Sequence, residues 1–198
     1  LRDHGAGHQL DLVEEHDRQH DRADVLAALI KRNWQGALMG GITDRPAVEA
    51  CFAAGEDATL SLKIGGSLDP ESPSVTVEAK VLKLDDPDAA DQRQAVVGIG
   101  GIIVILAARR RPYHMIADFT RLGFDPKAVR LLVVKSGYLS PELAPIANPN
   151  LMALTDGVIN QDIERIPNTR RKRPSFPFDK DFDFAPEVFF SSRWVSET

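Results

Sequence analysis

Apolar and polar residues alternate through the middle of the chain, and this alternation limits the possible folds more than any other feature of the sequence. Apolar side chains recur at Leu60, Leu62 and Ile64, and again at every second position over residues 75–81. A period of two is typical of a strand with one buried face. Because the turn-rich stretch GGSLDPESPS lies between the two runs, we expect two antiparallel strands here.

A tight hairpin is predicted directly after these strands. Two apolar runs, residues 95–99 and 102–107, flank Gly100 and Gly101. Glycine tolerates the positive φ that a two-residue hairpin turn requires. The middle of the chain is therefore expected to be an antiparallel meander and not a series of helical crossovers.

Helices and further strands are predicted on both sides of the meander. The predicted helices are residues 22–32, a second helix that begins after Thr43 or Asp44 and includes residues 47–53, and residues 115–122 and 140–146. The further strands are largely apolar runs at residues 36–42, 129–134 and 151–154. Thr43 or Asp44 is a candidate cap for the second helix, which has Pro46 in its first turn. Residues 1–20 lack a sustained apolar period and are expected to form a polar loop. The sequence thus predicts the α/β class, with a mixed sheet, packed helices and an antiparallel meander in the middle of the chain.

The composition excludes several classes of function. The chain has 198 residues, 43% of them hydrophobic, which is enough for one globular domain with its own core. A net charge of -5 argues against nucleic acid or an anionic membrane as a partner. The single cysteine, Cys51, excludes an intrachain disulfide, and no apolar stretch is long enough for a membrane-spanning helix. We expect a cytoplasmic protein, with one domain over residues 1–180 and an extended C-terminal tail over residues 181–198.

Four of the five histidines lie within the first 20 residues. Gly5 and Gly7 interrupt the earlier part of the segment, so only the i, i+4 pair His16 and His20 has a spacing compatible with one helix face. Neutral imidazoles bind zinc, so His16 and His20 are candidate metal ligands. Two ligands do not close a tetrahedral zinc site, and the alternative is a set of exposed histidines with no ligand.

Polar side chains follow the buried strand at residues 129–134. Lys135, Ser136 and Tyr138 lie where an open α/β sheet usually offers its ligand crevice, and they are candidate substrate-binding residues. Because neighbouring strand residues point to opposite faces, Lys135 and Ser136 are not expected to act as a catalytic dyad. The alternative is that these side chains only complete the structure of the loop.

A second group of candidates follows the strand at residues 102–107. Arg109 and Arg111 alternate along the chain, and a guanidinium group can bind a substrate carboxylate through two hydrogen bonds. The alternative is a charged sheet edge that resists pairing with other chains. His114 comes just before a predicted helix and is the one candidate proton carrier, although a capping or surface histidine is the simpler interpretation.

Several motifs together resemble a known family. In chain order they are DHGAG, GGITDRPAVEACFAAG, AARRRPYH, VVKSGYLSPELAPIANPNLMAL and RRKRPSFPFD. They resemble the C-terminal domain of the microcystinase C (MlrC) type of zinc metallopeptidase, over about residues 1–180. Residues 8–21 depart from the glycine-rich stretch that is usual in this family.

The resemblance implies a domain that covers and shapes the active site of a zinc-bearing N-terminal domain in the same polypeptide. The zinc ligands would lie in that other domain, and a metal-activated water would attack a peptide or amide substrate. Two alternatives stay open: a non-catalytic interaction module that kept the fold without the metal domain, and a histidine-rich metal-binding protein. Assembly into a homo-oligomer also stays open.

Overall fold

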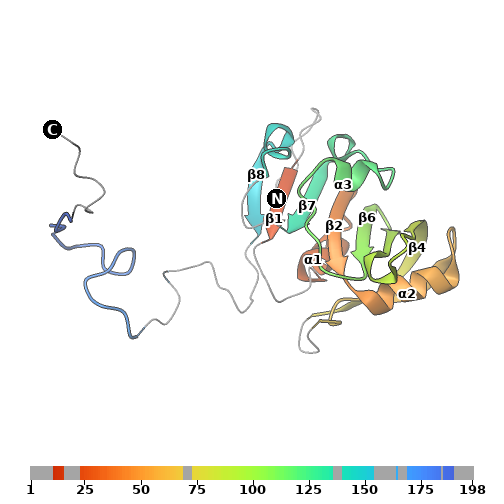
Figure 1. Cartoon of the computed structure of the whole chain (residues 1–198), viewed down its shortest axis with the longest axis horizontal. Coiled ribbons are helices and arrows are strands. Elements are labelled where there is room, and N and C mark those ends of the chain that lie inside the picture. The colour runs from red at the N-terminus through yellow and green to blue at the C-terminus, as the bar shows by residue number, and fades with distance from the viewer. Residues whose placement is uncertain are drawn as a thin grey trace. The chain divides into compact units, whose positions relative to one another are not determined.

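The computed structural model describes residues 11–15, 23–68, 73–135, 140–153, 164, 169–183 and 185–189. The chain divides into two compact units, residues 1–161 and residues 162–198. The first unit contains every helix and strand discussed below (Figure 1).

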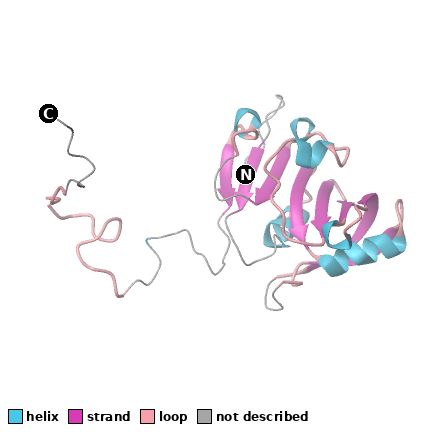
Figure 2. Ribbon diagram, viewed as in Figure 1, coloured by secondary structure: helices cyan, strands magenta, loops and turns pink. Residues whose placement is uncertain are grey.

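An eight-stranded mixed sheet forms the centre of the first unit (Figure 2). In chain order the strands are β1 (Asp11–Glu15), β2 (Ala37–Thr43), β3 (Thr59–Ile64), β4 (Val75–Asp85), β5 (Gln94–Ile99), β6 (Ile102–Ala107), β7 (Leu131–Lys135) and β8 (Asn150–Ala153). Across the sheet the order is β3-β4-β5-β6-β2-β7-β1-β8. Neighbours from β3 to β6 are antiparallel, whereas β6, β2, β7, β1 and β8 are all parallel. The predicted α/β class, mixed sheet and central meander are confirmed.

Strand β1 is a correction to the sequence analysis, which expected a polar loop over residues 1–20. Its backbone pairs in parallel with β7 on one side and β8 on the other, with Leu12 opposite Leu132 and Val13 opposite Val133. The sequence DLVEE has only two apolar residues between acidic ones, so no local period identifies it as a strand. The backbone hydrogen bonds from two neighbouring strands decide its conformation.

The helices are α1 (Ala23–Lys31), α2 (Arg45–Ala54) and α3 (Ala117–Thr120), and the short 3-10 helices are Ala90–Gln92, Pro126–Ala128 and Ala144–Ile146. Asp44 caps α2 as predicted, since its Oδ1 accepts a 3.1 Å hydrogen bond from the backbone N–H of Ala47. The helix predicted over residues 115–122 is only four residues long, because the hydrogen bonds on both sides of it run from residue i to i+3. The helix predicted from Ser140 is a turn followed by a 3-10 helix.

Both faces of the sheet are covered at β2, β5, β6 and β7, whereas β3 and β4 keep exposed side chains at alternate positions. On one face, α1 and α2 pack against β-strand residues such as Met39, Val104 and Val133. On the other face, their sequence neighbours Leu38, Ile105 and Leu132 pack against α3 and the segment that precedes it. This explains why the runs in β2, β6 and β7 are apolar throughout instead of alternating. Since both faces of these three strands are buried, their polar side chains that can reach a ligand lie at the strand ends.

The second unit has no α-helix or strand within residues 164, 169–183 and 185–189. Its local order comes from polar and ring contacts. The Arg171 guanidinium lies 4.2 Å from the centroid of the Phe178 ring, and the Asp179 carboxylate accepts a 3.0 Å hydrogen bond from the backbone N–H of Ser175. The domain boundary expected at residue 180 stays a prediction.

Candidate functional site

Residues 108–116 follow β6 and cross one face of the sheet, and we call them the crossing segment. Two consecutive glycines in β2 determine where this segment crosses. The register between β2 and β6 shifts between Met39 and Ile42, so that Gly40 and Gly41 form an irregularity in the strand, and Gly41 has φ +73°. A Cβ atom on Gly41 would lie 2.0 Å from Cε2 of Tyr113, and one on Gly40 would lie 2.9 Å from Phe119. The glycines therefore allow the Tyr113 ring to lie directly on the backbone of β2.

Tyr113 also joins a buried polar network. Its hydroxyl donates a 2.5 Å hydrogen bond to Oε1 of Gln94, and Nε2 of Gln94 donates a 2.6 Å hydrogen bond to Oδ2 of Asp85. The same Asp85 oxygen lies 3.1 Å from the Arg121 guanidinium. Tyr113 and Gln94 are fully buried, so the network fixes residues 108–116 against the start of β5 and the end of β4.

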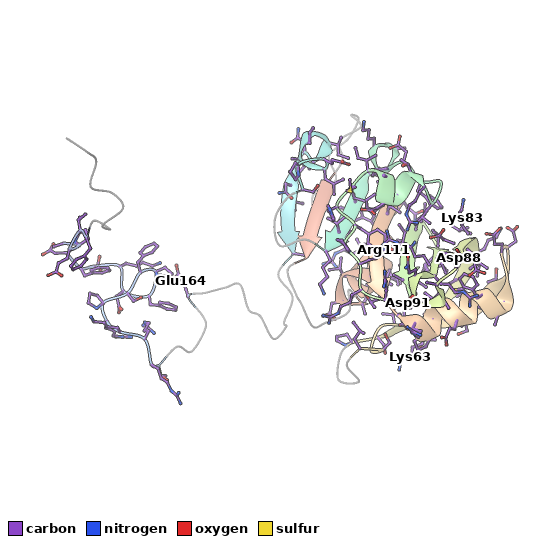
Figure 3. All side chains as sticks on the ribbon, in the orientation of Figure 1. Lys63, Lys83, Asp88, Asp91, Arg111 and Glu164 are labelled. Carbon is purple, nitrogen blue, oxygen red and sulfur yellow. The ribbon has the colours of Figure 1, made fainter. Side chains whose placement is uncertain are left out.

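A pocket of about 300 Å³ lies beside this crossing segment, and we call it the arginine pocket. Its polar lining consists of Gln92, Arg93, Arg109, Arg110, Arg111 and Asp118. Figure 3 labels Arg111 in this part of the sheet, together with Asp91, the ion-pair partner of Arg109. The structure thus brings the predicted substrate-binding residues Arg109 and Arg111 to one cavity.

Three of the four arginines are held in place by carboxylates. Arg93 Nε lies 2.7 Å from Asp86, and its guanidinium lies 4.7 Å from the centroid of the Phe52 ring. The two remaining pairs are Arg109 with Asp91 at 3.0 Å and Arg111 with Asp118 at 3.3 Å. A guanidinium group has five N–H donors, so a single carboxylate partner orients it and leaves donors for a ligand.

Asp118 organises the end of the crossing segment. Its Oδ2 accepts hydrogen bonds from the backbone N–H groups of His114 and Met115, at 3.1 and 3.0 Å, while its Oδ1 pairs with Arg111. The backbone carbonyl of His114 accepts a hydrogen bond from the Ser140 hydroxyl. The His114 side chain is exposed, and its imidazole has no hydrogen-bond partner among the described residues. A proton-carrying role for His114 stays a prediction.

Of the other predicted site residues, the structure describes Lys135. Lys135 is the last residue of β7, is half-buried, and is paired in register with Glu15 of β1. Ser136, Tyr138, His16 and His20 lie outside the described residues. Within the described part of the chain, no group of three or more His, Cys, Asp or Glu side chains is arranged to hold a metal ion.

Sequence reasoning missed Arg93, Arg110 and Asp118 as pocket residues. For Arg93, the register of the β5–β6 hairpin offered a signal that it lies near Arg109. Pairing of Gln94 with Ala107 brings Arg93 opposite Ala108, and the Ala108 N–H donates a 3.0 Å hydrogen bond to the Arg93 carbonyl. No comparable signal was available for Asp118, because its contact with Arg111 depends on how the crossing segment turns into α3.

Two buried titratable groups lie near α2, away from the arginine pocket's lining. Burial raises the pKa of Asp44 above its ordinary value, although hydrogen bonds from the N–H groups of Ala47 and Gly65 oppose this shift. Burial also raises the pKa of the Cys51 thiol to about 11, with a smaller contribution from the charge of Asp44. Cys51 is a buried core residue.

The architecture defines an α/β domain in which a mixed sheet presents an arginine-lined pocket at the start of β5 and the end of β6. A similar fold occurs in the crystal structure of a "putative metallopeptidase" from Mesorhizobium sp. BNC1, with a TM-score of 0.68 and 21% sequence identity. The match covers 90% of this chain and 40% of that protein, so the chain spans less than half of its length. No curated protein matches this sequence.

Residues 19–170 match the model of the family described as the MlrC C-terminus. Because this match covers most of the chain, the chain belongs to that family, and the resemblance inferred from the sequence motifs is confirmed. No helix among the described residues has the length and apolar character needed to cross a membrane. The cytoplasmic location stays a prediction.

Proposed function

We propose that this domain works with a metal-bearing N-terminal domain as part of an MlrC-type metallopeptidase or amidohydrolase, and that it covers and shapes the active site. The observation that carries the proposal is the family match over residues 19–170. Further support comes from the similar fold in the Mesorhizobium protein, which is described as a "putative metallopeptidase". This chain covers 40% of that protein. Zinc is the proposed metal, held by residues of the other domain.

A zinc ion held by the other domain would supply a bound water of lowered pKa, the nucleophile that amide hydrolysis needs. The residues of this domain perform the binding part of the reaction. Arg109 and Arg111 are oriented by Asp91 and Asp118 and hold a polar group of the substrate. Lys135 is the proposed contact at the carboxyl end of β7, with Ser136 and Tyr138 following it in the sequence. A covering domain also excludes water, which strengthens electrostatic contacts in the site.

The proposal is tested by comparing two proteins under the same conditions. One is a polypeptide that carries this domain together with an MlrC-type N-terminal domain, loaded with zinc, and the other is residues 1–198 alone. We expect hydrolysis of linear peptides or amides by the first and none by the second. Hydrolysis by residues 1–198 alone contradicts the proposal, and a zinc-loaded two-domain protein without activity supports the non-catalytic interaction module.

The positioning role of Lys135 is tested in the same assay. We expect Lys135→Met to reduce turnover by more than about tenfold, the scale of one lost positioning contact, with little change in melting temperature. Lys80→Met is the matched control, because Lys80 is an exposed lysine that pairs with Asp57 on the meander side of the sheet. Equal losses of folding and activity in Lys135→Met would show that Lys135 is structural.

A further inference from the structure

The four guanidinium groups of the arginine pocket differ in what they already bind. Arg93, Arg109 and Arg111 each pair with one carboxylate. Arg110 lines the same pocket, is exposed, and pairs with none of the carboxylates that the structure describes. Three carboxylates therefore face four cations, and the group retains one uncompensated positive charge.

We propose that the arginine pocket binds a carboxylate group and that Arg110 is its main contact. The planar guanidinium of Arg110 presents two parallel N–H donors, which match the two oxygens of a carboxylate. Nε of Arg111 is buried and has no hydrogen-bond partner within the described part of the molecule. A buried donor without a partner is costly. Arg111 also lines the pocket, so its guanidinium is the second candidate contact for the ligand.

Asp118 restricts the charge of the ligand. It lies in the pocket lining, its side chain is only 15% exposed, and two backbone N–H groups hold its carboxylate in place. A phosphate dianion would be repelled by this fixed negative charge, and only one positive charge is available to offset the repulsion. A carboxylate monoanion meets the same cation with less repulsion, so the pocket favours a carboxylate over a phosphate.

The volume of about 300 Å³ suits one small acidic group, such as an acidic side chain or the carboxyl terminus of a peptide. That the group belongs to a substrate rests on the function proposed above. In that setting the substrate is an acidic peptide or amide whose carboxylate is held at the arginine pocket, apart from the bond that is cleaved. Carboxylate binding itself needs no metal domain, so it is measured with residues 1–198 alone.

The test is an NMR titration of the ¹⁵N-labelled chain, observed at the arginine Nε–Hε resonances. The probe is N-acetylglycine, and the matched neutral probe is N-acetylglycinamide. We expect saturable shifts for Arg110 and Arg111 with the acid only, at millimolar concentrations. Arg110→Gln should weaken binding of N-acetylglycine at least about tenfold, since it removes the positive charge and the paired N–H donors.

Lys31→Gln is the control variant, because it removes one positive charge from an exposed position in the last turn of α1 and does not change the pocket. It should bind N-acetylglycine as the unmodified chain does. The proposal is overturned by equal shifts with the neutral probe, by unchanged affinity in a folded Arg110→Gln variant, or by tighter binding of inorganic phosphate. Since no hydrolysis is measured, binding without peptidase activity would leave this inference standing and contradict only the proposed enzymatic function.

Discussion

The hydroxyl of Tyr113 donates a 2.5 Å hydrogen bond to the side-chain oxygen of Gln94, and both residues are fully buried. This bond joins the crossing segment to the first residue of β5. Arg109, Arg110 and Arg111 lie between Tyr113 and the end of β6, so their backbone is held at both ends. The position of the arginine pocket therefore depends on a contact outside its lining.

Replacement of Tyr113 by phenylalanine tests this contact. The ring would still fill the space above β2, but Oε1 of Gln94 would lose its partner in a buried position. We expect the free energy of unfolding to fall by about 1–3 kcal/mol, the cost of an unsatisfied buried polar group. Urea denaturation measures the loss, and the double variant with Gln94→Leu should show that the two changes are not additive. A change below about 0.5 kcal/mol would mean that the bond contributes little.

Gly41→Ala tests the close approach of Tyr113 to β2. The new Cβ would lie 2.0 Å from Cε2 of a fully buried ring, at a residue with φ +73°. Overpacking and left-handed strain together should cost about 2–5 kcal/mol. Gly100→Ala is the matched control, because Gly100 also has positive φ, +56°, but nothing lies within 4 Å of its added Cβ.

The control variant should lose only about 1–2 kcal/mol, from left-handed backbone strain alone. Thermal and urea unfolding of the two variants give the comparison. Equal destabilisation of Gly41→Ala and Gly100→Ala would show that contact with Tyr113 is unimportant for the fold.

The raised pKa of Asp44 predicts a specific pH dependence of stability. Burial raises this pKa above its ordinary value of 3.8, so the folded state holds the proton at pH values where the unfolded state has lost it. The contribution of Asp44 to stability is thus complete below about pH 3.8 and is lost as pH rises through the folded-state pKa. The asparagine side chain of the Asp44→Asn variant does not titrate in this pH range.

We therefore expect the free energy of unfolding of the natural chain, relative to Asp44→Asn, to fall as pH rises above 3.8, the ordinary pKa of this carboxyl group. Urea unfolding of both proteins at each pH gives the difference, and other carboxylates cancel in it. A difference that grows with pH would show that the hydrogen bonds from Ala47 and Gly65 outweigh the effect of burial.

The Cys51 thiol should react very slowly in the folded chain. Its pKa of about 11 leaves roughly one molecule in a thousand as thiolate at pH 8, and the side chain is fully buried. A thiol-specific disulfide reagent should label one thiol per chain at once in denaturant and with a long delay in buffer. Labelling in buffer as fast as in denaturant would contradict the buried position in α2.

Local patterns were sufficient for part of the fold. The cap at Asp44 and the hairpin at Gly100 depend on a few neighbouring residues, and both were predictable from the sequence. Strand β1 was not, because its pairing partners in β7 and β8 are more than 100 residues away along the chain. The extent of α3 was also missed, since hydrogen bonds to Asp118 and tertiary packing of Phe119 override the helical period.

The candidate site was predictable only for residues that directly follow one another along the chain. Arg109 and Arg111 were found because they follow a strand end. Arg110 was not selected, because the argument relied on alternate residues facing one side, and that alternation stops at Ala107, where β6 ends. The sequence could not show which arginines are already paired, because Asp86, Asp91 and Asp118 approach from other elements.

In the proposed function, this domain serves a metal centre built by another domain. The most direct measurement is the zinc content of purified residues 1–198 after dialysis, determined by elemental mass spectrometry. We expect well below one zinc ion per chain, and the same value for His16→Ala. One tightly held zinc ion per chain, lost in His16→Ala, would contradict the account and identify a histidine-rich metal-binding protein instead.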